Sequence, residues 1–248
     1  MDLSAVHNLA NDPLQQTEEL LGFLNERISE DKNLNLERLD YLLDFAQAIG
    51  DFAGPQIADS LASSSIVEEL TRKIPEVSNP RDATILFSKM TVLFASLEKL
   101  EKARSYYEDA KTNFNKLPTE SVRGNDKLIN FQMLSVLPFF ACAQAVVGET
   151  KAAQLNFSKA VDLSLALQSH PKSRSMILQE IAFFQLRAGF KKTAFQTINL
   201  MPDLGLRKQA LDELNKPARF ANFEELLNFL NVRLRRLEIE LPNLGVGR

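Results

Sequence analysis

A short sequence pattern occurs twice in this chain, and the two copies stand 41 residues apart. Each copy ends in a glycine, followed five residues later by an alanine and nine residues later by a large apolar residue. These residues are Gly148, Ala153 and Phe157 in the first copy and Gly189, Ala194 and Ile198 in the second. A repeat of this length is typical of stacked helical units that share one continuous core. We therefore expect a helical scaffold that presents a surface.

The spacing extends to a third, earlier copy. In every copy an apolar residue precedes the alanine by 16 residues: Phe87 and Ala103, Leu137 and Ala153, Leu178 and Ala194. A helix pair whose second helix carries alanine and, four residues later, a large side chain resembles a tetratricopeptide repeat. The copies here stand 50 and 41 residues apart, whereas that family has a period of about 34 residues. The resemblance covers roughly residues 81–216.

This resemblance implies an all-α, tetratricopeptide-like α-solenoid, a right-handed superhelix of antiparallel helix pairs. Helical periodicity and short polar breaks predict about twelve helices along the chain. We expect an N-terminal helical segment at 1–79 packed on the array, repeats at 80–216, and a capping helix and tail at 217–248. The final helix is too apolar to stand alone, which predicts that it covers the helices at 190–216.

In tetratricopeptide arrays the leading helices line a concave face, and the resemblance places the same positions on this chain. The implied partner-binding groove consists of Ser88, Val92, Ala95, Pro138, Cys142, Ala145, Gln179, Phe183 and Leu186. These residues are mostly apolar, and an exposed apolar strip is typical of an interaction site. The expected function is a non-enzymatic protein–protein interaction module, or adaptor, that binds a helical or apolar peptide segment.

Two alternatives stay open. In a homo-oligomeric structural protein, another copy of the same chain would fill the groove. A helical regulator would bind a small ligand there. An enzyme is not expected, because the chain has two histidines and one cysteine and lacks the spacing of a metal site. His170 precedes Pro171 and is interpreted as a helix cap. We expect no catalytic residue, no metal and no cofactor.

Composition restricts the partners and the compartment. A net charge of −3 argues against broad binding of nucleic acid or of a membrane surface. Cys142 has no second cysteine to pair with, and the N-terminus has no signal-peptide pattern. These features predict a cytoplasmic protein with a protein or peptide partner, and they leave a homo-oligomer open.

Overall fold

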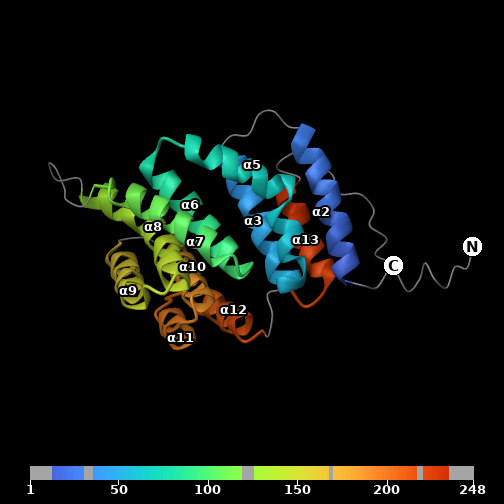
Figure 1. Cartoon of the computed structure of the whole chain (residues 1–248). Coiled ribbons are helices and arrows are strands. Elements are labelled where there is room, and N and C mark those ends of the chain that lie inside the picture. The colour runs from blue at the N-terminus through green and yellow to red at the C-terminus, as the bar shows by residue number, and fades with distance from the viewer. Residues whose placement is uncertain (1–12, 31–35, 119–125, 168–169, 217–219, 235–248) are drawn as a thin grey trace, which may run out of the picture. The chain divides into compact units, whose positions relative to one another are not determined.

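The computed structural model describes residues 13–30, 36–118, 126–167, 170–216 and 220–234 (Figure 1). Every regular element in these ranges is a helix, and none of the described residues forms a strand. The all-α fold is thereby confirmed for this part of the chain. A superhelical arrangement of the tetratricopeptide kind stays a prediction. The helices group into two compact units, whose chain segments alternate along the sequence.

The first unit combines the beginning and the end of the chain. Its α-helices are α2 (Pro13–Glu30), α3 (Leu36–Ala53), α4 (Ala58–Ala62), α5 (Ser65–Lys73) and α13 (Phe223–Leu234). Two short 3-10 helices, η1 (Gly54–Ile57) and η2 (Ile74–Glu76), connect them. The Ser64 side chain caps α5 by accepting a hydrogen bond from the Val67 N–H group. Helix α3 packs against α5, η1, α2 and α13.

Helix α13 belongs to this first unit, which differs from the cap predicted at 190–216. It packs on α3 and α2 (Figure 1, red beside blue). The rings of Phe52 and Phe223 lie 6.0 Å apart between α3 and α13. The apolar stripe on the final helix showed correctly that the helix must be covered. Periodicity does not say which of several apolar faces covers it. Residues 235–248 of the capping helix and tail expected at 217–248 lie outside the described residues.

The second unit contains the repeat region, residues 78–95 and 100–217. Its helices are α6 (Pro80–Ser96), α7 (Leu100–Phe114), α8 (Asp126–Val146), α9 (Thr150–Ala166), α10 (Pro171–Arg187), α11 (Lys191–Asn199) and α12 (Leu204–Leu214). Helix α8 packs most extensively against α9, and α10 against α11. Helix α10 also contacts α8, α9 and α12. The His170 imidazole accepts a hydrogen bond from the Lys172 N–H group and caps α10, as its position before Pro171 predicted.

The repeated alanines lie where the paired helices meet. Ala153 on α9, Ala182 on α10 and Ala194 on α11 are each fully buried, and Phe157 on α9 is buried as well. A methyl side chain lets two helix backbones approach closely, and a neighbouring large side chain then fills the space between units. Ala182 and Ala194 join Leu178 and Ile198 in one buried cluster.

The two repeated glycines end their helices as predicted. Gly148 and Gly189 have φ angles of +98° and +82°. In each case the glycine N–H group and the next residue's N–H group bond back to carbonyls of the last turn, the Schellman arrangement. Glu98 occupies the same position in the earliest copy and also has a positive φ, of 59°. The left-handed turn is therefore kept even where glycine is absent.

We predict that replacing Gly148 with Val destabilises the fold by about 1–2 kcal/mol, because a β-branched residue tolerates a left-handed backbone poorly. No atom within 4 Å would meet a new Cβ at this position, so backbone strain is the cause. Urea unfolding measures the effect. Gly22 inside α2 is the control, since its Cβ would also meet nothing and it has no positive φ. Gly22→Ala should stabilise the protein by up to about 1 kcal/mol. Equal effects of both changes would contradict the turn assignment.

We also predict the consequence of deleting the chain after Lys216. The deletion removes α13 and uncovers the apolar faces of α3 and α2. Amide hydrogen exchange should then accelerate in α2 and α3, while α10 and α11 keep their protection. Loss of protection first in α11 and α12 would instead support a cap on the repeat helices.

Candidate functional site

The structure places the predicted groove residues at different depths. Phe183 is exposed, at 41%. Four others are half-buried: Ala95, Ala145, Gln179 and Leu186. The remaining four are buried: Ser88, Val92, Pro138 and Cys142. Only Phe183 of these nine residues is exposed, and a partner-binding groove formed by them stays a prediction. Helical period shows which residues share a face, but not whether another element covers that face.

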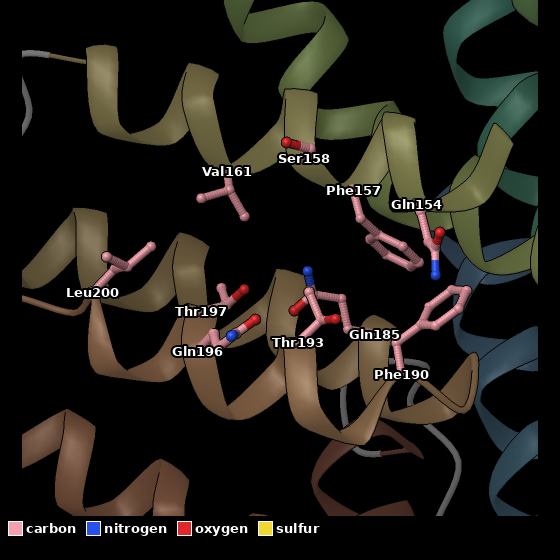
Figure 2. Close-up of a pocket in the computed structure, with 10 residues that line it drawn as sticks. All are labelled: Gln154, Phe157, Ser158, Val161, Gln185, Phe190, Thr193, Gln196, Thr197 and Leu200. Carbon is pink, nitrogen blue, oxygen red and sulfur yellow. The ribbon is translucent and has the colours of Figure 1, made fainter. Parts of the chain in front are cut away.

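A pocket lies elsewhere in the second unit, between α9 and α11 (Figure 2). We call it the α9–α11 pocket. Its volume is about 320 Å³. It is lined by Gln154, Phe157, Ser158, Val161, Gln185, Phe190, Thr193, Gln196, Thr197 and Leu200. Figure 2 shows Phe157 and Phe190 toward one end of the pocket, and Val161 and Leu200 toward the other. The two phenylalanine rings meet edge to face, with their centroids 5.9 Å apart.

Gln185 is the most unusual residue of this pocket. Its side chain comes from α10, and Figure 2 shows it between the two helices that form the walls. The residue is fully buried. Neither its Nε2 nor its Oε1 atom has a hydrogen-bond partner among the described residues. A buried polar atom without a partner costs about 1–3 kcal/mol. The site therefore contains an unused donor and an unused acceptor side by side.

In the preceding junction of the repeat, where α7, α8 and α9 meet, the glutamine equivalent to Gln185 has hydrogen-bond partners. Gln144 is four residues before its glycine, as Gln185 is before Gly189. The Gln144 Oε1 atom accepts a hydrogen bond of 2.7 Å from Asn156 Nδ2. The Tyr107 hydroxyl donates to Glu149 Oε2 at 2.5 Å. Lys111 Nζ lies 3.6 Å from Glu149 Oε1. This cluster of side chains is called the polar junction below.

Every member of the polar junction has a counterpart in the α9–α11 pocket. Counting from the repeated alanines and glycines, Tyr107 corresponds to Phe157, Lys111 to Val161, Gln144 to Gln185, Glu149 to Phe190 and Asn156 to Thr197. All five counterparts line the pocket. The glutamine is kept, while the phenol, the ammonium and the carboxylate are replaced by apolar groups. The pocket is thus the same structural position with its polar partners removed.

The electrostatics of the two junctions differ accordingly. Burial, followed by the hydrogen bond to the Glu149 carboxylate, raises the pKa of Tyr107 well above its usual range. None of the described residues lining the α9–α11 pocket has an ionisable side chain. The pocket can therefore offer hydrogen bonds and apolar contacts. It offers neither a charge nor a general acid or base.

Sequence reasoning missed this pocket although its signal was present. The spacing of the repeat pairs Tyr107 with Phe157 and Glu149 with Phe190. A polar-to-apolar change between copies is the signal that could have indicated the pocket. The unsatisfied state of Gln185 is a three-dimensional property, because it depends on which atoms face the side chain.

Comparison of the chain with protein-family models, with curated proteins and with solved structures gives no match. The tetratricopeptide resemblance accordingly stays an interpretation of the repeat spacing. Within the described ranges, no helix is long and apolar enough to cross a membrane. Nor do these ranges contain a group of three or more histidine, cysteine, aspartate or glutamate side chains that could hold a metal ion.

The polar junction yields a testable prediction about Tyr107. Its raised pKa means that folding favours the neutral phenol. This contribution to stability is present below the unfolded-state pKa of about 10 and is lost as pH rises above it. We expect the free energy of unfolding to fall more steeply in that range for the wild type than for Tyr107→Phe. Absorbance titration of the phenolate provides the second measurement. Identical pH profiles of the two proteins would contradict the assignment.

Proposed function

We propose that this protein is a non-enzymatic protein–protein interaction module that binds a peptide segment in the α9–α11 pocket. The observation that supports this most directly is the replacement of a closed polar junction by a pocket at the equivalent position. Both junctions bury their repeated alanines and end the leading helix at a glycine with a positive φ angle. What differs is the set of side chains that would otherwise occupy the space.

The chemistry of the lining favours recognition over catalysis. Ser158 and Thr193 carry hydroxyl groups, but no lining residue could activate them as a base. Neutral donors and acceptors with apolar surroundings are suited to orienting a bound group. Phe190, Val161 and Leu200 supply the accessible apolar surface, whose burial contributes roughly 25 cal/mol per Å².

The shape of the lining fits a segment of chain. On α9 the lining residues run from Gln154 to Val161, and along α11 and its two capping residues they run in the same direction from Phe190 to Leu200 (Figure 2). Seven residues of helix correspond to about 10 Å, at roughly 1.5 Å per residue. An extended peptide covers that distance in about three residues, at roughly 3.3 Å each.

A regulator that binds a small ligand is the second candidate. It is favoured by the pocket volume of about 320 Å³, at the lower limit of small-molecule sites, which span roughly 300–1,000 Å³. The size of the partner distinguishes the interaction module from the small-ligand regulator. A bound peptide segment belongs to a protein, which affinity capture would retain. A homo-oligomer whose own segment fills the pocket would show a mass that depends on concentration.

The proposed function predicts that Thr193→Glu weakens partner binding at least about tenfold, equivalent to roughly 1.4 kcal/mol. Thr193 is exposed at the pocket lining, so the fold should tolerate the carboxylate. A ligand entering the pocket would have to desolvate that charge without any cation in the lining. Affinity capture on the immobilised full chain, with mass spectrometry, identifies the partner, and titration of the isolated partner measures the change.

Two control variants make this test specific. Thr112→Glu makes the same substitution at an exposed position of α7 and should leave binding unchanged. Phe183→Glu changes the exposed face of α10 that the sequence first indicated. If Phe183→Glu abolishes binding while Thr193→Glu does not, the partner docks on α10 and the pocket assignment is wrong.

A further inference from the structure

We infer that the α9–α11 pocket recognises the backbone of an extended peptide, through paired hydrogen bonds between one residue of that peptide and the side-chain amide of Gln185. The inference rests on the function proposed above and specifies the ligand chemistry. It begins from two buried atoms, Nε2 and Oε1, that lack a partner among the described residues. The ligand must therefore supply one acceptor and one donor, close together and on the same side.

The chemistry of Gln185 excludes several ligand classes. A carboxylate offers only acceptors, so it would leave Oε1 unpaired, and the lining provides no cation to neutralise it. An ammonium or guanidinium offers only donors and would leave Nε2 unpaired. A hydroxyl can donate and accept, but one oxygen atom cannot face both amide atoms in good geometry.

An extended peptide meets the requirement. In a β-strand the N–H and C=O groups of one residue point to the same side, where an opposite residue exchanges both hydrogen bonds with them. The side-chain amide of Gln185 presents one donor and one acceptor in a plane and would take the place of that opposite residue. The flanking residues of the peptide would then lie toward Phe157 and Phe190 at one end and Val161 at the other.

Gln144 shows that the protein can satisfy this position internally. At the polar junction its amide accepts from Asn156 and lies beside the Tyr107 hydroxyl. In the pocket, Phe157 lacks that hydroxyl and Thr197 replaces the asparagine. A tyrosine at position 157 would place a phenol where the peptide backbone is expected to bind.

The test uses the full-length chain and a library of N-acetylated tripeptide N-methylamides with neutral side chains. NMR detects binding through the side-chain amide resonance of Gln185, which is assigned by its loss in Gln185→Met. We expect at least one tripeptide to shift this resonance together with the backbone resonance of Thr193. Among the three ester analogues in which the N–H of one residue is replaced by oxygen, one should bind at least about fivefold more weakly.

Three variants complete the experiment. In Gln185→Met the amide and ester peptides should bind equally, because the paired hydrogen bonds are gone. Phe157→Tyr should bind the tripeptide at least about fivefold more weakly, since the phenol competes for Gln185. Tyr107→Phe is the matched control at the polar junction and should bind it as the wild type does.

The outcomes separate this inference from the proposed function. If a tripeptide occupies the pocket but binds no more tightly than any of its ester analogues, the backbone inference is wrong. The proposed interaction module is not contradicted by that result. Isobutyramide binding as tightly as the tripeptide would also overturn it, because the site would then recognise a primary carboxamide. If no member of the library shifts the Gln185 or Thr193 resonances, both the inference and the peptide-binding pocket are refuted.

Discussion

The structure of the second unit depends on the close approach of helices at small side chains. Ala153, Ala182 and Ala194 are completely buried, so the backbones on either side of them come near each other. Interiors packed at this density leave little space that a side chain does not fill. Whatever lies beside the alanines is therefore held in a narrow environment from which water is largely excluded. Gln144 and Gln185 are the polar side chains placed there by the repeat.

A buried glutamine in such an environment is either hydrogen-bonded or left without a partner, and this chain contains one example of each. At the polar junction, Asn156 and Tyr107 provide partners for Gln144, and Glu149 in turn binds Tyr107 and Lys111. A satisfied network of this kind rigidifies the packing around it. In the α9–α11 pocket the partners are replaced, and Gln185 keeps its hydrogen-bonding capacity unused. The repeat therefore contains its own comparison between a junction whose glutamine is paired and one whose glutamine has no partner among the described residues.

Helical content and the glycine turns could be predicted from the sequence because both depend on local rules. Apolar residues at helical spacing indicated the helices, and a glycine after the last turn indicated the left-handed conformation of Gly148 and Gly189. The destination of α13 could not be predicted, since an apolar stripe fits any complementary face. The burial of Val92 and Cys142 could not be predicted for a related reason: it depends on what covers the leading helices. Predicting the pocket would have required recognising that several polar residues of one copy are apolar in the next. The importance of that change is clear only once the contacts between these residues are known.

The unsatisfied amide also has a thermodynamic consequence for the region around the pocket. In the unfolded chain Gln185 is hydrated, and no described residue replaces those hydrogen bonds in the folded state. A ligand that pairs with the amide restores those bonds only in the folded state. Its binding must therefore stabilise the folded state by an amount that grows with ligand concentration. The helices that gain most are α9, α10 and α11, which contribute the lining. If the proposed function holds, ligand binding at Gln185 is thus coupled to the order of these three helices.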